Sequence, residues 1–339
     1  MSGLEQLIKD LNKKYSDNIA KMGIEEKEVG RIPFSSPSLN RMTYGGIPRN
    51  RFIEIFGPDN CGKSTLTLDL ISNYQKLDDS KTVLYVDYEK TFDAVWAKTM
   101  GVDVDKVLLI QPEVESGEDV FDIIFQATET NEIGLVILDS IASLVPKQIK
   151  GESTEKQQMG GISKALTRFT NDYCSLLTKY NCTFIGLNQV REDMDNMWNE
   201  FVTTGGRAWK HGCSMRISLR KGKFIDDNRN ELTSRAENPS GHYINAFLEK
   251  SKVCPSNRRN GYATLFFLTG IDTIGDTVEA AMMLGLIQGK GWYNLVDYET
   301  GELIEGKKFQ GKANLIKYFK ENQEDYELLW KEVNKRITV

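Results

Sequence analysis

The chain has 339 residues, of which 40% are hydrophobic and 27% charged, so it is long enough for about two domains and too apolar to be disordered. Its 48 acidic and 43 basic residues give a formal net charge of -5, which excludes a globally basic protein and leaves a local patch for any nucleic acid. Five scattered cysteines without a C-x-x-C pair and only two histidines disfavour a disulfide framework, a zinc site and a Ser-His-Asp triad.

The first expected element is an amphipathic helix, because Leu4, Leu7, Ile8, Leu11 and Tyr15 recur at helical spacing between charged residues. This N-terminal stretch lacks the apolar core of a signal peptide, and no segment reaches the roughly 18 apolar residues of a membrane helix. We therefore expect a cytoplasmic protein without a membrane partner.

Residues 32–50 are rich in Ser, Pro and Gly and predict a linker into a first core strand at residues 52–56. Near-continuous apolar runs then alternate with helical patterns, which predicts a mainly parallel sheet covered by helices on both faces. After residue 213, strand patterns follow one another without helices and predict an antiparallel extension of that sheet. The parallel-type runs are 82–87, 106–110, 134–139 and 182–188, and the later ones are 214–220, 242–250 and 262–268.

The strand at residues 52–56 leads directly into a match to G-x-x-x-x-G-K-[ST] that opens a helical pattern. Backbone N–H groups of such a loop and the helix N-terminus cradle phosphates, Lys63 would reach the β- and γ-phosphates, and Ser64 would ligate Mg²⁺. The predicted nucleotide-binding residues are Gly57, Pro58, Asp59, Asn60, Cys61, Gly62, Lys63, Ser64 and Thr65.

Two carboxylates at strand ends complete a candidate hydrolytic site. Asp139 ends the run 134–139 and is placed to hold Mg²⁺ beside a triphosphate. Glu89, just after the strand 82–87, is our candidate for the base that takes a proton from the attacking water, with Asp87 as the alternative.

Several stretches are similar to the bacterial-type RecA recombinases, bacteriophage versions included. They are IEIFGPDNCGKSTLTL, VLYVDYEKTFDAVWAKTMGVD, VILDSIASLVPK, MGGISKALTR, FIGLNQVR, TTGGRAWK, EKSKV, GWY and GKANLIKYFKEN. The resemblance runs nearly end to end and implies an α/β RecA-type P-loop ATPase core with a small α+β C-terminal domain. It also implies Mg²⁺ and ATP bound between protomers, filaments on single-stranded DNA, and strand exchange with homologous duplex DNA in recombination and repair.

By the same resemblance, Glu89 corresponds to the catalytic glutamate and Gln189 to the residue that senses the γ-phosphate. Asp93 and Trp96 fall where family members contact adenine. Lys250 and Lys252, two apart in a strand and so on one face, correspond to a pair that completes the neighbouring protomer's site. The N-terminal helix becomes an oligomerisation element.

Two loops of the family's DNA-binding kind are expected near residues 146–161 and 191–207. The second is net acidic here, which predicts weaker intrinsic DNA affinity and greater dependence on loading or mediator proteins. The candidate DNA-binding residues are Lys147, Lys150, Lys164, Arg191, Thr203, Thr204, Gly205, Gly206, Arg207 and Lys210.

The expected domains are an N-terminal oligomerisation helix with its linker (1–32), the ATPase core (33–269) and a small C-terminal domain (270–339). Two other functions stay open from the residues alone: a regulator that signals nucleotide state without recombining, and a hexameric helicase. The intact set Lys63, Glu89, Asp139 and Gln189 disfavours the first. The late GKAN segment and the TTGG sequence disfavour the second.

Overall fold

The computed structural model describes residues 3–15, 20–23, 29–78, 80–113, 115–147, 161–192 and 201–338. Residues 1–30 and residues 31–339 form two separate compact units. The first unit contains helix α1 (Gly3–Lys14), in which no residue is buried. The Asn12 side chain closes this unit by hydrogen bonds with the backbone N and O of Ala20, at 2.8 and 2.9 Å.

The second unit is built on a ten-stranded sheet whose main path has the order β12-β11-β10-β9-β3-β7-β6-β4-β5. Strands β9, β3, β7, β6, β4 and β5 are parallel, and β10, β11 and β12 extend the sheet in antiparallel fashion. This confirms the predicted α/β fold. The strands are β3 (Phe52–Gly57), β4 (Thr82–Asp87), β5 (Val107–Ile110), β6 (Ile133–Asp139), β7 (Thr183–Glu192), β8 (Phe201–Thr203, paired with β7), β9 (Met215–Ile225), β10 (Gly241–Ser251), β11 (Asn260–Phe266) and β12 (Gly270–Ile271).

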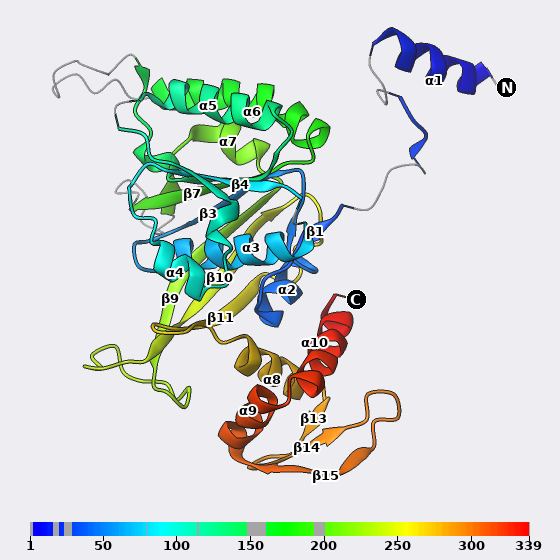
Figure 1. Cartoon of the computed structure of the whole chain (residues 1–339), viewed down its shortest axis with the longest axis vertical. Helices are drawn as coiled ribbons and strands as arrows, with labels where there is room; N and C mark the ends of the chain where they lie inside the picture. Colours follow the sequence, from blue (N-terminus) through cyan, green and yellow to red (C-terminus); the bar gives the residue numbers. More distant parts are fainter. Residues whose placement is uncertain are drawn as a thin grey trace. The chain divides into compact units, whose positions relative to one another are not determined.

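Helices cover both faces of the parallel part, because alternate strand residues point to opposite sides. Leu84 and Val86 join a buried cluster with α5 (Gly117–Glu129), α6 (Gly161–Lys179) and α7 (Gly206–Gly212). Val83 and Tyr85 join the opposite cluster with α3 (Lys63–Leu77) and α4 (Ala94–Thr99). Figure 1 shows α5, α6 and α7 on one side of the sheet and α3 on the other. Short 3-10 turns lie at Val104–Lys106 and Ile141–Ser143.

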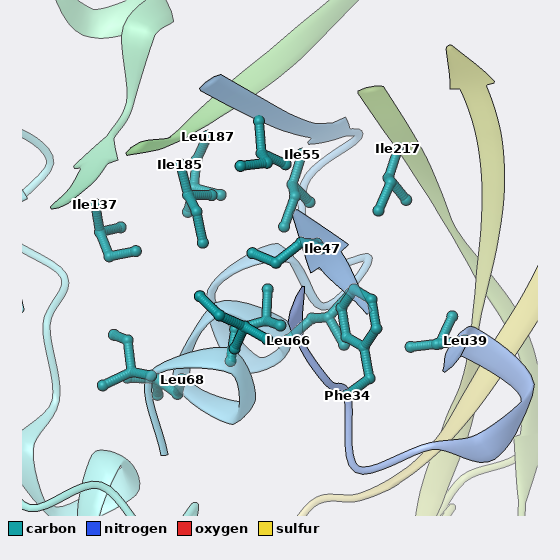
Figure 2. Packing of buried hydrophobic residues seen from close by; sticks show 14 of the residues in the cluster. Phe34, Leu39, Ile47, Ile55, Leu66, Leu68, Ile137, Ile185, Leu187 and Ile217 are labelled. Carbon is teal, nitrogen blue, oxygen red and sulfur yellow. The ribbon is translucent and has the colours of Figure 1, made fainter. Parts of the chain in front are cut away.

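The predicted linker at residues 32–50 is wrong. This segment forms β1 (Arg31–Ile32), α2 (Pro37–Thr43) and β2 (Ile47–Pro48). Ile32, Phe34, Leu39, Met42 and Ile47 are fully buried in the core cluster. Figure 2 shows Phe34 and Ile47 between Ile55 of β3 and Leu66 of α3, and Leu39 packs against β11. The Asn40 side chain accepts from Phe34 N and donates to Phe34 O, both at 2.8 Å, which closes the turn before α2. The Ser, Pro and Gly residues therefore shape tight turns within the core.

The C-terminal part combines helices with a small antiparallel sheet around its own buried cluster, as the predicted α+β domain requires. Asn40 Nδ2 donates to Asn334 Oδ1 at 3.3 Å, and Arg258 donates to Ile337 O at 2.6 Å, so its last helix contacts the core. The elements are α8 (Thr273–Met283), β13 (Ile287–Gln288), β14 (Trp292–Val296), β15 (Leu303–Gln310), α9 (Gly311–Glu321) and α10 (Gln323–Ile337). In the described ranges, no helix has both the length and the apolarity to span a bilayer.

Candidate active site

The glycine-rich loop lies between the buried strand β3 and helix α3. Gly62, with φ of 97°, occupies the left-handed region directly before α3. A Cβ on Gly57 would approach Leu219 O at 2.4 Å, so the loop packs directly on β9. The Lys63 ammonium bends back and donates to Gly57 O at 2.9 Å and Pro58 O at 2.8 Å. In the same loop, burial raises the pKa of the Cys61 thiol.

Ser64 and Asp139, the candidate metal ligands, are brought together because β3 and β6 end at the same edge of the sheet. Ser64 Oγ donates to Asp139 Oδ2 at 3.4 Å, and the buried Tyr85 hydroxyl donates to the same oxygen at 2.8 Å. Burial, together with the charges of Glu89 and Asp87, raises the pKa of Asp139 to about 6. A hydroxyl and a carboxylate in one place are the hard oxygen donors that suit Mg²⁺.

Glu89 lies beside this pair. Its Oε1 accepts hydrogen bonds from Ser140 Oγ at 2.6 Å, Ser143 Oγ at 3.0 Å and Gln189 Nε2 at 3.2 Å. Glu89 and Gln189 are 100 residues apart in sequence. They lie close together because they are at or near the ends of β4 and β7, which flank β6 in the sheet. The arrangement presents one carboxylate, oriented by neutral donors, to the space above the loop.

Asp87, the alternative base, is engaged elsewhere. It is fully buried and accepts from Thr91 N at 3.1 Å, Phe92 N at 2.9 Å and Gln111 Nε2 at 2.9 Å. Its carboxylate holds the turn after β4 and contributes nothing to the lining of the cavity described next.

A cavity of about 540 Å³ connects these groups. One side carries Glu89, Asp139 and Gln189. The sequence analysis did not predict the other side, which is formed by β9, β10 and β11. Periodicity predicts these strands but does not indicate which of their residues lie near the phosphate loop. The lining residues on that side are Lys221, His242, Leu265 and Phe267.

Asp93 directly precedes α4 and Trp96 lies on it, and neither belongs to the lining of this cavity as far as the described residues form it. Asp93 Oδ1 caps α4 by accepting from Val95 N at 2.8 Å and Trp96 N at 3.0 Å. Trp96 Nε1 donates to Thr65 Oγ1 at 3.4 Å, and Thr65 does line the cavity. The Trp96 indole therefore lies at the edge of the nucleotide cavity, next to the phosphate-binding loop.

Lys250 lies on β10, but the strand ends at Ser251 and Lys252 follows it, so the expected position of both lysines within one strand is wrong; their side chains nevertheless reach the same backbone. Both ammonium groups donate to His211 O, at 3.0 and 2.6 Å, and Lys250 also donates to Lys210 O at 2.6 Å. These carbonyls belong to the last turn of α7. Burial, followed by the Lys252 charge, lowers the pKa of Lys250.

The candidate DNA-binding residues are only partly described. Residues 148–160 of the first loop, which include Lys150, and residues 193–200 of the second lie outside the described residues, as does the side chain of Arg191. Lys147 Nζ pairs with Asp119 at 3.4 Å. The starts of α6 and α7 adjoin, because a Cβ on Gly206 would lie 3.3 Å from Ser163, and this places the exposed Lys164 and Arg207 in one region.

A buried polar cluster fixes the end of the second loop. Glu54 accepts from Asn188 Nδ2 at 2.8 Å and from Arg216 Nε, and Asn188 Nδ2 also donates to Thr204 O at 2.8 Å. Arg216 donates further to Thr203 Oγ1 at 3.2 Å. Thr203 is therefore held by Arg216 of β9, and Thr204 by Asn188, the residue before Gln189. Gly205, with φ of 109°, then begins α7, and Lys210 lies in its last turn.

Comparisons with known proteins agree with this geometry. Residues 2–271 match the family model described as the RecA N-terminal domain. The chain is 32% identical to Protein RecA of Ruminococcus albus, over 90% of this chain and 75% of that protein. It is 32% identical to Protein RecA of Phytoplasma mali (99% of this chain, 95% of that protein) and 31% identical to Protein RecA of Malacoplasma penetrans (98% and 96%).

The chain belongs to the RecA family. It is therefore a nucleotide-binding, DNA-dependent ATPase and a recombinase of DNA recombination and repair, as the sequence analysis predicts. The family model ends at residue 271, next to the start of α8 at Thr273.

Proposed function

We propose that this chain hydrolyses ATP with Mg²⁺ and couples the reaction to pairing and strand exchange between single-stranded and homologous duplex DNA. The observation that carries this proposal is the gathering of Lys63, Ser64, Glu89, Asp139 and Gln189 around one cavity at the end of β3. A protein that only bound nucleotide would need the loop but not the oriented carboxylate.

The hydrolytic roles follow from these contacts. The loop amides and Lys63 bind the phosphates, and Ser64 with Asp139 would hold Mg²⁺, which supplies positive charge to the phosphate oxygens. Water attacks the γ-phosphorus, the bond to the bridging oxygen of ADP breaks, and the Glu89 carboxylate takes the water's proton. Ser140 and Ser143 keep the accepting oxygen of Glu89 in place.

Self-assembly into helical filaments would complete the site. Lys250 and Lys252 would exchange their carbonyl partners for phosphate oxygens of a neighbouring protomer, which are stronger acceptors because they are charged. Helix α1, whose Leu4 and Leu7 are exposed, would pack on the next protomer. Asp93 and Trp96 would contact the adenine.

DNA would bind along the two loops through phosphates rather than base edges. Arg191, Lys147, Lys150, Lys164, Arg207 and Lys210 would supply charge, and the backbone amides of 203–206 would add uncharged donors. The net acidic second loop would make binding weak at physiological salt, so loading or mediator proteins are expected partners. Homology would be read by base pairing between strands.

The test is an ATPase assay with and without single-stranded DNA, combined with a strand-exchange assay. Stimulation by DNA together with product formation supports the proposal. ATP binding without either activity would indicate a nucleotide-sensing regulator instead. Electron microscopy with ATP and DNA separates an open filament from the closed ring of a hexameric helicase.

A further inference from the structure

The Glu89 carboxylate is held through one of its two oxygens. Its Oε1 accepts hydrogen bonds from Ser140 Oγ at 2.6 Å, Ser143 Oγ at 3.0 Å and Gln189 Nε2 at 3.2 Å. Within the described ranges, no residue donates a hydrogen bond to its Oε2. The direction in which Glu89 presents its carboxylate to the cavity therefore depends on the donors to Oε1.

Ser143 differs from the other two donors in its place in the fold. Ser140 and Gln189 line the nucleotide cavity together with Glu89, but Ser143 does not belong to that lining as far as the described residues form it. It ends the 3-10 turn Ile141–Ser143, which follows β6. Any effect of the Ser143 hydroxyl on hydrolysis must therefore pass through the residues that it contacts.

The Ser143 hydroxyl has two acceptors to choose from. Ser140 Oγ and Ser143 Oγ lie 3.0 Å apart, and both lie within hydrogen-bond distance of Glu89 Oε1. These three contacts share two hydrogens, because each hydroxyl has one and a carboxylate has none. Ser143 therefore donates either to Glu89 or to Ser140, and a small rotation of its side chain changes how firmly Glu89 is held.

The turn that carries Ser143 leads directly into the first loop. Lys147, a candidate DNA-binding residue, is four residues after Ser143. Val145 O accepts from Gly117 N at 2.8 Å, and Lys147 N donates to Glu118 Oε2 at 2.9 Å. These bonds fasten the start of the loop to the first turn of α5. A displacement at Lys147 would reach Ser143 through a short segment with little slack.

The side chain of Lys147 is held only weakly. Its Nζ lies 3.4 Å from Asp119 Oδ1, and the two side chains are 69% and 32% exposed. Ion pairs this exposed contribute little to stability, and a DNA phosphate competes for the same ammonium. DNA that binds Lys147 would therefore replace Asp119 and displace the start of the loop.

We propose that Ser143 is a positioning residue that transmits DNA binding at the first loop to the base, through the choice of its hydroxyl between Glu89 and Ser140. The inference rests on the proposed function, which makes Glu89 the base and Lys147 a DNA contact. Gln189, by contrast, connects Glu89 with the second loop. Loss of the Ser143 hydroxyl should weaken the effect of DNA on turnover without weakening the binding of ATP or DNA.

The experiment measures kcat of the full chain for ATP with Mg²⁺, with and without saturating single-stranded DNA, and the dissociation constants for ATP and DNA. S143A should reduce the stimulation by DNA about fivefold, the order expected for one hydrogen bond, while both dissociation constants stay within about twofold. S143T keeps a hydroxyl and should keep most of the stimulation. S175A is the control and should behave as the wild-type chain, because Ser175 is exposed and donates only to Asp172 O of its own helix, at 3.2 Å.

A second background separates positioning from a structural role. In Glu89→Gln protein, S143A should cause little further loss of turnover, because the hydroxyl acts through a carboxylate that is no longer there. Damage to the turn itself would add its full loss in both backgrounds. If S143A fails to fold by circular dichroism, S143C provides the same comparison, since a thiol is a weak donor of similar size.

Stimulation by DNA that is unchanged in S143A, or lost equally in S143T, overturns the proposal, as does a full additional loss in the Glu89→Gln background. Failure of the proposed function has a different signature. Glu89→Gln protein would then hydrolyse ATP at the wild-type rate, or DNA would not stimulate the wild-type chain, and either result would remove both proposals.

Discussion

The side-chain amide of Gln189 donates a hydrogen bond to Glu89 Oε1 at 3.2 Å. Gln189 lies on β7, the strand that leads into the second loop, and Asn188 beside it is bonded to Thr204 at the other end of that loop. The proposed base and the proposed DNA-binding loop are therefore two hydrogen bonds apart. If DNA binds the loop as proposed, a movement of the loop would change the donors around the carboxylate and so alter the hydrolytic step.

Glu89→Gln should leave ATP binding intact and lower kcat by about 10² to 10⁴, because the amide keeps the shape of the side chain but cannot take a proton. The measurement is ATP turnover with DNA present, alongside the dissociation constant for ATP. Glu113→Gln is the matched control, since Glu113 is an exposed carboxylate paired with Lys90 one residue beyond Glu89. A kcat within about threefold of the wild-type value would remove Glu89 from the role of base.

Asp139→Asn should stabilise the metal-free, nucleotide-free chain at pH 7.5. The pKa of Asp139 is raised to about 6, so its contribution to stability is present below pH 3.8 and lost as pH rises through 6. Asparagine does not ionise, so the variant should gain roughly 2 kcal/mol in free energy of unfolding at pH 7.5 and nothing near pH 3.8. Urea denaturation with chelator at both pH values measures this.

Mg²⁺ should raise the ATP affinity of the wild-type chain but not that of Asp139→Asn, because the variant lacks a carboxylate ligand for the metal. Asp122→Asn provides the control, as Asp122 is an exposed carboxylate on α5 that does not belong to the lining of the nucleotide cavity. Equal free energies of unfolding for the wild type and Asp139→Asn at pH 7.5 would show that ionised Asp139 does not destabilise the free chain.

Arg229→Met should destabilise the contact between the core and the C-terminal part by about 3 kcal/mol at pH 7. Arg229 is 7% exposed and pairs with Asp272 at 2.7 Å, Asp276 at 2.8 Å and Glu279 at 3.3 Å. Burial raises the pKa of Asp276 to about 6 despite this arginine. Without Arg229 the buried carboxylates are uncompensated, so the loss should shrink as they become protonated below pH 6, which urea titrations at pH 7 and pH 4.5 would reveal. A loss independent of pH would assign the role of Arg229 to packing.

The phosphate loop and Asp139 could be predicted from sequence because each is a local pattern at the end of an apolar strand. Glu89 and Asp87 could not be separated in that way, since both follow the same strand. Only the structure reveals that the Asp87 carboxylate already accepts hydrogen bonds from Thr91, Phe92 and Gln111. The residues alone therefore favour Glu89 while leaving Asp87 as the alternative, and the family resemblance adds support for Glu89.

The Ser, Pro and Gly content of residues 32–50 predicts a linker. The three-residue spacing of Leu39 and Met42, which both face the core from α2, is too short a pattern to predict a helix against that composition. His242 and Phe267 could not be predicted as cavity residues for a different reason. The antiparallel pairing of β9, β10 and β11 brings them to the phosphate loop. The register and the β-bulge of this pairing depend on contacts between strands distant in sequence, which a local pattern does not contain.

The last prediction concerns Lys250 and Lys252, whose ammonium groups both donate to His211 O at the end of α7. If they act on a neighbour's triphosphate, the double variant Lys250→Ala, Lys252→Ala should bind ATP as a monomer nearly normally. It should lose DNA-stimulated hydrolysis by about 10³-fold or more, because cations supplied across an interface stabilise the charge of phosphoryl transfer. Lys223→Ala is the control for removing a lysine, because the Lys223 side chain on β9 is exposed.

Mixing the double variant with Glu89→Gln protein distinguishes this role from a merely structural hold on α7. Mixed filaments contain interfaces in which an intact Glu89 faces intact lysines, so turnover should rise above that of either variant alone and pass through a maximum near equal proportions. A local loosening of α7 would stay within each protomer and could not be repaired by a neighbour. Absence of recovery at every ratio, in filaments verified to contain both chains, would rule out action across the interface.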